Sequence, residues 1–331
     1  MDRRTFIQTL GTATLAAHLP LAAETGSGGR ITLLHTNDTH SRIEPFGPGS
    51  GNLTGKGGIA RRATLVKQLR RAIPNVLLLD AGDVFQGTPY FNEYKGFLDF
   101  KLMSMCGYDA GTLGNHDFDR GVEGLVAAMS EAHFPILNCN LDVKGAPALA
   151  ARLDPWLVKD LPGIRVGLTG VCVDFKGLVA AENHLGVEWR DPEAALKPVL
   201  KHLREVEKVD LVVLLSHLGY DRQGDAIDDL NLARLVPGLD IIIGGHTHTF
   251  MDAPVKVVNG ERECQIFQVG FGGVNLGRMD LVVRQGARMA SSGRAVPIQA
   301  GALSSGSTEG RALTPAFIFI SPIPPGPATS H

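Results

Sequence analysis

Histidine, aspartate and asparagine side chains gather directly after several apolar runs of this sequence. The clusters are Asp38-Thr-His40, Asp83, Asn115-His116, His217 and His246-Thr-His248. Each cluster alone is compatible with ordinary turn chemistry, because polar residues are common where strands end. If the apolar runs are parallel strands, however, their carboxyl ends meet at one edge of a sheet, where ligands bind. Taken together, the clusters predict a shared site for metal ions.

The ligand types narrow the chemistry of such a site. Carboxylate, imidazole and amide donors without thiolates suit Mn, Zn, Fe or Co. The sequence offers more donors than a single tetrahedral ion could use, whereas a binuclear site with a shared carboxylate would use them all. Two ions roughly 3.5–4 Å apart can hold both the attacking and the leaving oxygen of a displacement at phosphorus. Phosphoester hydrolysis is therefore the reaction that these residues favour.

Short apolar runs and helix-length segments alternate from residue 31 onward. Strands are predicted at Ile31–His35, Val76–Asp80, Ala110–Leu113, Pro135–Cys139, Val166–Val173, Leu211–Ser216, Ile241–Gly244 and Gln265–Val269. Helices are predicted at Ile59–Ala72, Phe97–Met105, Gly121–Ala132, Pro192–Val206 and Ala226–Leu235. Most strand runs are continuous in Val, Ile and Leu, which is typical of strands covered on both faces. The alternation indicates an α/β fold and, by itself, one doubly wound sheet.

The composition bounds the class of protein. The 331 residues include 32 Lys plus Arg against 34 Asp plus Glu, a net charge of −2, and 44% are hydrophobic. These values are typical of one large folded domain or two small ones, and the lack of a long basic run argues against nucleic-acid binding. The four cysteines are widely spaced, so we expect neither a thiolate metal site nor a disulfide.

The two ends of the chain differ from its middle. Residues 1–23 combine Arg3-Arg4, a short apolar stretch and small residues, and they resemble a twin-arginine export signal. An uncleaved N-terminal tail is the alternative. Residues 284–331 are rich in Ser, Gly, Ala and Pro and are predicted to be a low-complexity, disordered tail. We therefore expect an exported bacterial protein, periplasmic or extracellular, with no membrane attachment after removal of the signal.

Longer motifs surround the polar clusters. They are Leu34-His-Thr-Asn-Asp-Thr-His40, Gly57-Gly-Ile-Ala-Arg61, Asp80-Ala-Gly-Asp-Val-Phe-Gln-Gly-Thr88, Gly114-Asn-His-Asp-Phe-Asp119, Ser216-His-Leu-Gly219, Gly244-Gly-His-Thr-His248 and residues 268–277. In combination they resemble the calcineurin-like metallophosphoesterase superfamily, and more narrowly its 5′-nucleotidase branch, over about residues 31–282. The resemblance implies a single catalytic domain over residues 30–283, with a four-layer α/β/β/α sandwich in place of one doubly wound sheet.

The resemblance also implies how the ligands divide between two divalent metal ions. Asp83 would bridge the two ions. The other ligands would be Asp38, His40 and His248 at the first ion, and Asn115, His217 and His246 at the second. Many relatives carry glutamine at the position of His248, and either residue type can bind a metal.

Further roles follow from the same resemblance. His116 would stand beside the scissile bond as the general acid, with Asp119 orienting its imidazole. Asn115 would also contact the substrate. Apart from the resemblance, Arg61 is a candidate contact for the substrate phosphate, although a solvated residue in the first turn of a helix is the favoured interpretation. Asp117 is nearer to His116 in sequence than Asp119 is, but we expect its carboxylate to bond the backbone or cap a helix.

The predicted function is an exported binuclear-metal phosphoesterase that hydrolyses phosphomonoesters, with 5′-nucleotides favoured, by in-line attack of a metal-bridging hydroxide. Its partner would be a small phosphoester and not nucleic acid, and the sequence predicts no oligomeric state. Full-length 5′-nucleotidases continue into a second, nucleoside-binding domain, which we expect this chain to lack. Two alternatives stay open: a phosphodiesterase or sulfur-ester hydrolase of the same superfamily, and a catalytically decayed metal-dependent binding protein.

Overall fold

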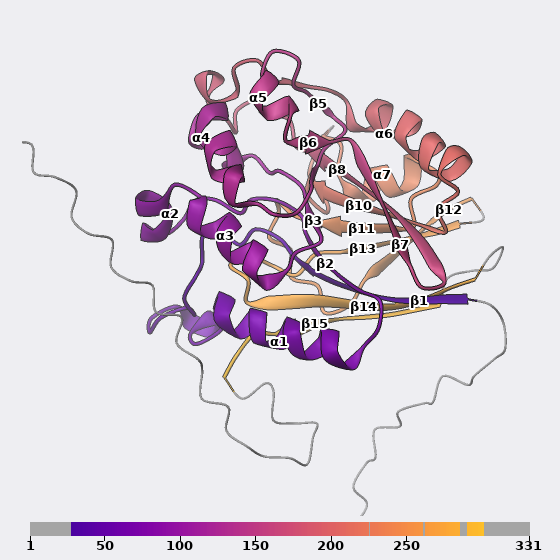
Figure 1. Cartoon of the computed structure of the whole chain (residues 1–331), viewed down its shortest axis with the longest axis horizontal. Helices are drawn as coiled ribbons and strands as arrows, with labels where there is room; N and C mark the ends of the chain where they lie inside the picture. The colour runs from indigo at the N-terminus through magenta and orange to yellow at the C-terminus, as the bar shows by residue number, and fades with distance from the viewer. Residues whose placement is uncertain (1–27, 225, 261, 285–289, 301–331) are drawn as a thin grey trace, which may run out of the picture.

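Two large β-sheets form the centre of the computed structural model, which describes residues 28–300 apart from residues 225, 261 and 285–289 (Figure 1). The first sheet has the strand order β15-β14-β1-β2-β3-β4-β6, and the second has the order β12-β13-β11-β10-β8-β7. Strands β5 and β9 form a small separate pair. The two large sheets together position every candidate ligand described below.

The strands have the following bounds. The first sheet contains β1 (Gly28–Thr36), β2 (Val76–Asp80), β3 (Ala110–Gly111), β4 (Ile136–Leu137), β6 (Leu153–Asp154), β14 (Asn275–Arg284) and β15 (Ala290–Pro297). The second sheet contains β7 (Trp156–Leu161), β8 (Ile164–Cys172), β10 (Leu211–His217), β11 (Ile241–Gly244), β12 (Val255–Asn259) and β13 (Arg262–Phe267). The small pair consists of β5 (Leu141–Asp142) and β9 (Glu188–Trp189).

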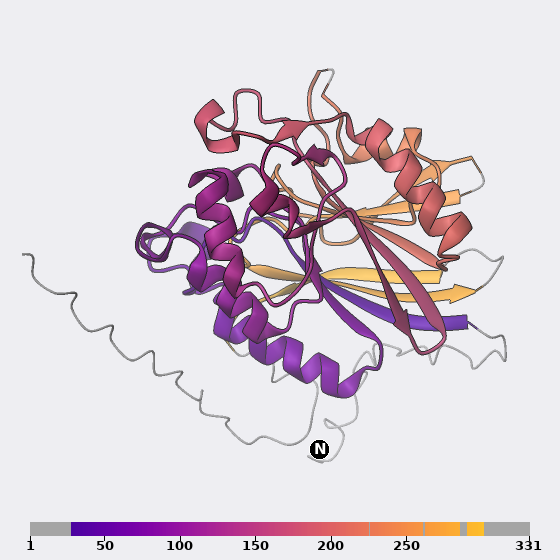
Figure 2. The same cartoon turned by 45° about the horizontal axis from the view of Figure 1, so that its top comes forward.

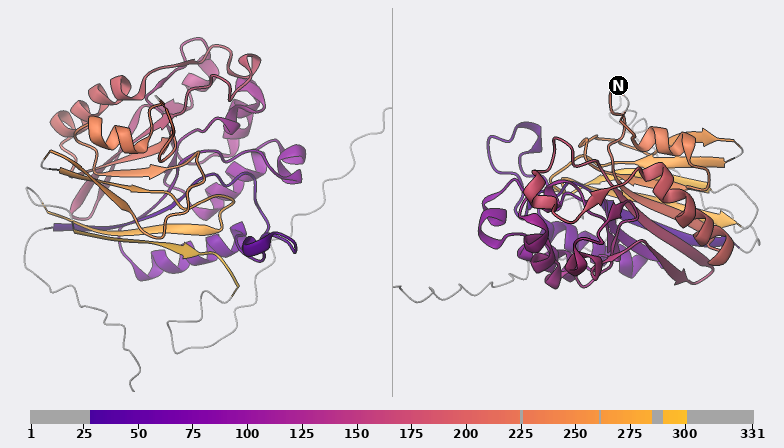
Figure 3. Two further views of the ribbon diagram at one scale, coloured as in Figure 1. Left: turned by 180° about the vertical axis from the view of Figure 1, so that it is seen from behind. Right: turned by 90° about the horizontal axis from the view of Figure 1, so that it is seen from above.

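Helices lie on the outer sides of the paired sheets, with α1 on one side and α6 and α7 on the other (Figures 1 and 3). The α-helices are α1 (Ile59–Ala72), α2 (Pro89–Tyr94), α3 (Phe97–Cys106), α4 (Gly121–Ala128), α5 (Pro147–Ala150), α6 (Pro192–Lys201) and α7 (Asp229–Leu235). Short 3₁₀ turns cover η1 (Gly51–Leu53), η2 (His116–Phe118), η3 (Met129–Glu131) and η4 (Ala181–His184), and a π-helical turn, η5 (His202–Val206), continues α6.

The alternation of side chains along the central strands explains the layers. Leu33 of β1 and Leu215 of β10 belong to the apolar core between the two sheets. Their sequence neighbours Leu34 and Leu214 point to the opposite faces and pack in the core beneath the helices. All four side chains are fully buried, which explains why these strands are continuously apolar in the sequence. The four-layer α/β/β/α sandwich is thereby confirmed.

The single doubly wound sheet that the βα alternation alone indicates is wrong. The strands form two separate sheets, and antiparallel strands lie toward the edges of both. Strand β14 pairs with β1, with Ile31 opposite Leu281, while β7 pairs with β8 and β12 pairs with β13. Figure 2 shows β14 and β15 beside β1 in the first sheet. The β1–β14 pairing joins segments far apart in sequence, so local alternation could not predict it.

The predicted helices all form, with small shifts at their ends. The helix expected at Ala226–Leu235 begins at Asp229, because the Asp228 carboxylate accepts the backbone N–H of Asn231 at 2.8 Å and caps it. The helix expected at Pro192–Val206 divides into α6 and η5. Among the described residues, no helix combines the length and the apolar character that crossing a bilayer requires. All four cysteines are free thiols.

The predicted tail is the second correction to the sequence analysis. A disordered segment from residue 284 onward does not hold for Ala290–Pro297, because these residues form β15 and pair with β14. The strand carries Ser291, Ser292 and Gly293, and it lies at the edge of its sheet, where low hydrophobicity is tolerated. The export signal predicted at 1–23 and the remainder of the predicted tail, from 301 onward, lie outside the described residues.

Candidate metal centre

All seven predicted metal ligands lie at the carboxyl ends of strands. Asp38 and His40 follow β1, Asp83 follows β2, Asn115 follows β3, His246 and His248 follow β11, and His217 is the last residue of β10. The strands concerned run parallel within each sheet, so their carboxyl ends share an edge. Six of the ligands fall into two groups, Asp38–His40–His248 and Asp83–His217–His246, and each group draws residues from both sheets.

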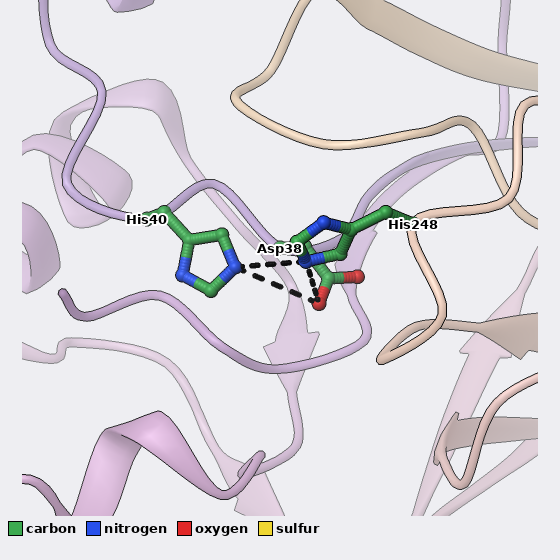
Figure 4. A group of neighbouring side chains, drawn as sticks. All are labelled: Asp38, His40 and His248. Carbon is green, nitrogen blue, oxygen red and sulfur yellow. Dashed lines mark hydrogen bonds and ion pairs between the residues drawn. The ribbon is translucent and has the colours of Figure 1, made fainter. Parts of the chain in front are cut away.

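Asp38, His40 and His248 form the first group (Figure 4). His248 Nε2 lies 2.9 Å from His40 Nε2 and 3.3 Å from Asp38 Oδ1. Nδ1 of His40 lies 2.9 Å from the carbonyl oxygen of Phe85, so this nitrogen carries the proton. Burial lowers the pKa of His40, which favours a neutral ring with a lone pair at Nε2. Lone pairs and a carboxylate that converge in this way fit a shared cation.

Asp83, His217 and His246 form the second group. His217 Nε2 lies 3.1 Å from Asp83 Oδ2, while its Nδ1 lies 2.7 Å from the carbonyl oxygen of Ala81. Asn115 belongs beside this group, because the backbone N–H of its neighbour His116 donates to Asp83 Oδ1 at 2.8 Å. Asn115 Oδ1 is buried and has no hydrogen-bond partner among the described residues. A buried polar atom without a partner is costly, and a metal ion would satisfy it.

The two groups lie side by side. His217 Nε2 of the second group is 3.9 Å from Asp38 Oδ1 of the first. The backbone N–H of His246 donates to both oxygens of Asp38, at 3.1 and 3.0 Å. Two candidate metal-binding groups therefore share a boundary formed by Asp38, and the donor set of carboxylate, imidazole and amide fits divalent ions.

When no metal is bound, a proton on His217 balances the negative charge of Asp83 in the second group. Burial alone would lower the pKa of His217, but the adjacent Asp83 carboxylate raises it to about 10. Burial alone would raise the pKa of Asp83, but His217 and the nearby histidines lower it. The result is a buried ion pair between an imidazolium and a carboxylate. A bound cation would replace that proton, since metal ligation requires neutral histidine.

Five of the ligands have a backbone conformation that is uncommon for residues other than glycine. The φ angles of Asp38, His40, Asp83, His246 and His248 lie between 49° and 71°. Left-handed residues of this kind are few, and Asp and His are among the types that adopt the conformation most readily. Such strain gathers at functional sites, where surrounding contacts hold it in place. The motifs identified these residues, but the sequence analysis did not predict their backbone conformation.

His116 and Asp119 form a pair at the border of the second group. His116 Nδ1 lies 3.0 Å from Asp119 Oδ2, and the two side chains are 35% and 29% exposed. The hydrogen bond to Asp119 raises the pKa of His116. The His116 ring also lies edge-on to the ring of His40, with 5.5 Å between centroids. The imidazole is thus oriented by a carboxylate and remains accessible next to both ligand groups.

Asp117 contacts the backbone, as the sequence analysis expected. Its Oδ1 accepts the N–H groups of Val84 and Phe85, and its Oδ2 accepts those of Asp83 and Gly114. Burial and the charge of Asp83 raise its pKa to about 7. This carboxylate fixes the turn that carries Asp83 against the loop that carries Asn115.

Arg61 is not among the residues that the structure brings together at the site. Its Nη1 donates to the carbonyl oxygen of Gly55 at 2.6 Å, which ties the start of α1 to the preceding loop. The next residue, Arg62, was missed by the sequence analysis. Its side chain is 3% exposed and lines a cavity of about 10 Å³ with the equally buried Asp99. Arg62 occupies the buried stripe of α1 with Ile59 and Val66, so an arginine at a core-facing helix position was the available signal.

Comparison with known proteins places this geometry in a family. The family model of the calcineurin-like phosphoesterase matches residues 31–250, a range that contains all seven candidate ligands. The 5′-nucleotidase of Rattus norvegicus is 37% identical over 244 residues, which are 72% of this chain and 41% of the rat protein. The trifunctional nucleotide phosphoesterase protein YfkN of Bacillus subtilis (strain 168) is 33% identical over 282 residues, 76% of this chain and 18% of that protein.

Among solved structures, that of a 5′-nucleotidase precursor from Thermus thermophilus superposes with a TM-score of 0.74 and 33% sequence identity, covering 83% of this chain and 55% of that one. The chain thus spans less than half the length of these two curated relatives. The chain belongs to the calcineurin-like phosphoesterase family.

Proposed function

We propose that this chain is a metal-dependent phosphomonoesterase that hydrolyses 5′-nucleotides. The observation that carries the proposal is the accessible His116–Asp119 pair beside two adjacent groups of metal-type ligands. One divalent ion would be held by Asp38, His40 and His248, and a second by Asn115, His217 and His246, with Asp83 between them. Mn, Zn, Fe and Co all suit these donors.

The chain's own residues have distinct tasks in this reaction. When bound, two divalent ions would neutralise the phosphate and lower the pKa of the attacking water. Asp119 holds His116 through Nδ1, so Nε2 is left to face the leaving group. The raised pKa of His116 favours a protonated ring. The proton at Nε2 passes to the leaving oxygen as the phosphorus–oxygen bond breaks, so that the product departs as a neutral alcohol.

Nucleotides are proposed as the substrates because the matched relatives are named for them. The 5′-nucleotidase of the rat and the 5′-nucleotidase precursor of T. thermophilus are 37% and 33% identical to this chain. We further propose that residues 30–283, extended by β15, form the catalytic unit. Export is proposed on Arg3-Arg4 and the short apolar stretch that follows, and cell fractionation of an Arg3→Lys, Arg4→Lys double variant tests it.

The test of the activity is phosphate release by the Mn²⁺-loaded chain. The substrates are 5′-AMP, a nucleoside diphosphate, a cyclic nucleotide and an aryl phosphate. His116→Ala should lower kcat by about 10²–10⁴-fold, the usual contribution of a general acid. His133→Ala is the matched control, because His133 is an exposed histidine outside the site.

Three outcomes would redirect the proposal. Preference for the cyclic nucleotide would favour a phosphodiesterase. Turnover that His116→Ala leaves unchanged would remove the assigned general acid. Metal binding without turnover of any of these esters would leave a sulfur-ester hydrolase or a metal-dependent binding protein, and a sulfur-ester substrate then separates those two.

A further inference from the structure

Three phenylalanines form a contiguous cluster against the first metal group. Phe271 stacks on His248, with 5.0 Å between ring centroids and 20° between ring planes. Phe46 and Phe250 each meet Phe271 edge-on, both with centroids 6.0 Å away. We call Phe46, Phe250 and Phe271 the aromatic cluster. The cluster therefore contacts a candidate metal ligand through Phe271, and Phe46 and Phe250 lie one ring further away.

Two glycines make room for this arrangement. Gly270 and Gly272 flank Phe271, and both have positive φ, at 84° and 63°. A Cβ at Gly270 would lie 2.2 Å from the ring of Phe250, and one at Gly272 would lie 2.7 Å from the ring of Phe46. Both rings therefore sit directly on the backbone of the Phe271 loop. Side chains at either glycine would displace a ring, so the cluster depends on local backbone shape.

The loop of Phe271 is also bonded to the residues around Asp38. The N–H of Gly272 donates to the carbonyl oxygen of Asp38 at 2.7 Å, and Asn37 Nδ2 donates to the carbonyl oxygen of Gly270 at 2.5 Å. The ligand His248 and the ring of Phe250 are only two residues apart in sequence. The aromatic cluster and the first metal group are therefore contiguous, through hydrogen bonds of the Phe271 loop and through the stacking of Phe271 on His248.

The three rings differ in how much of their surface is free. Phe271 has a face covered by His248, and Phe46 is 9% exposed with the Arg42 guanidinium 4.3 Å above its ring. Phe250, by contrast, is 51% exposed although it is a large apolar side chain. Its ring meets Phe271 edge-on and lies over the backbone of Gly270. Phe250 is thus the ring of the cluster with surface available for a ligand.

We propose that Phe250, supported by Phe271, is a stacking subsite for a planar heterocycle in the leaving group of the phosphoester. This inference rests on the proposed function, since it assigns the part of the substrate that lies beyond the phosphate. Aromatic side chains bind bases through their π-faces with little dependence on base identity. The subsite therefore selects nucleotides over sugar phosphates without selecting among the bases.

The test compares two substrates that share the phosphoester and differ in the base. KM and kcat are measured for 5′-AMP and for ribose 5-phosphate with the Mn²⁺-loaded chain. Stacking of one base corresponds to about 5- to 150-fold in affinity, and a half-exposed ring belongs at the lower end. Phe250→Ala should raise KM for 5′-AMP by about 5- to 20-fold and leave KM for ribose 5-phosphate unchanged. Phe250→Trp should restore the low KM.

A second readout needs neither metal nor turnover. Saturation-transfer NMR with adenosine and the metal-free chain should show contact of the base protons with the protein, and Phe250→Ala should abolish it. Leu235→Ala is the control: Leu235 is 52% exposed and ends α7 before β11 begins, at the opposite end of that strand from His246 and His248. This variant should match the wild type in both experiments.

The outcomes separate the subsite from the proposed function. Equal rises in KM for both substrates in Phe250→Ala would mean that the ring only supports His248, and the subsite would be refuted. Unchanged KM values, with adenosine contacts retained, would refute it as well. No phosphate release from either substrate by the wild type would count against the proposed function, while the adenosine contacts would still decide the subsite.

Discussion

Gly114→Ala is expected to abolish metal binding by the second group, Asp83, His217 and His246, while the fold and metal binding by the first group are kept. Gly114 precedes Asn115 and lies against the second group. A Cβ built on it would be 2.2 Å from Asp83 Oδ1 and 2.6 Å from His217 Nε2. Its φ is not in the left-handed region, so alanine brings no backbone strain there and its effect is steric.

The magnitude follows from these distances. Non-bonded contacts of a Cβ are rarely shorter than about 3.2 Å, so the Asp83 oxygen would have to move by about 1 Å. Metal–ligand distances tolerate only about 0.2 Å. His217 cannot yield in compensation, because it is fully buried and bonded through Nδ1 to Ala81. Substitutions of residues that only support a metal ligand typically lower metal affinity by roughly 10- to 100-fold. Because Gly114→Ala displaces a ligand itself, we expect a loss of at least about 100-fold for the second ion.

The assay is metal content after gel filtration, together with isothermal titration of Mn²⁺ into the metal-free chain. The wild type should bind two ions and Gly114→Ala one, with phosphate release falling in parallel. Gly111→Ala is the matched control, because a Cβ there would meet its nearest atom, of Phe134, at an ordinary 3.5 Å. Two ions bound at wild-type affinity in Gly114→Ala would refute the steric reasoning and the assignment of Asp83 and His217 as ligands.

Three further changes test other parts of the structure. Chelation of the metals should lower the free energy of unfolding by about 3–4 kcal/mol for each ion present at 100 to 1,000 times its Kd; an unchanged Tm in EDTA would contradict metal binding to the folded chain. Burial raises the pKa of Asp99 to about 7, so wild-type stability should fall as pH rises from 4 to 7 and stay low above it. Asp99→Asn should lack this pH-dependent loss, which amounts to up to about 4 kcal/mol of unfolding free energy at pH 8. Urea unfolding in EDTA measures it, and parallel pH profiles for the wild type and the variant would contradict the reasoning. Asp119→Asn should reduce kcat less than His116→Ala does, and the double variant should be no slower than His116→Ala alone; additive losses in the measured rates would show that the two residues act independently.

The central strands could be predicted from the sequence because a strand that is buried on both faces has a continuous run of apolar residues. Val212 and Leu214 face one side of β10, whereas Val213 and Leu215 face the other, and all four are fully buried. A continuous apolar run followed by a polar residue therefore located both the strand and its functional end. The bounds of α1, Ile59–Ala72, were also predicted from sequence, although its buried residues Ile59, Arg62 and Val66 occupy only one face of the helix.

The division into two sheets could not be predicted in this way, because β14 and β15 are not continuous apolar runs. β14 pairs with β1 over eight residue pairs that begin at Gly28 and Arg284, yet its sequence, NLGRMDLVVR, mixes polar and apolar residues. β15 is poorer still in apolar residues, and its place at the sheet edge depends on β14 being there. Pairing across some 250 residues of sequence is determined by tertiary packing, which strand propensity does not encode.

The candidate site shows the same division between residue identity and residue geometry. Motifs were enough to single out Asp38, His40 and His248, but their left-handed backbone is visible only in the fold. Each such residue costs about 1–3 kcal/mol, and the cost is sustained by long-range contacts such as Asp38 N–H to the carbonyl oxygen of Gly82 at 2.9 Å. Local preferences and global structure therefore disagree where the ligands converge. Disagreement of this kind is expected at functional sites, because ligand atoms from separate strands must be brought to one point at the expense of the backbone that carries them.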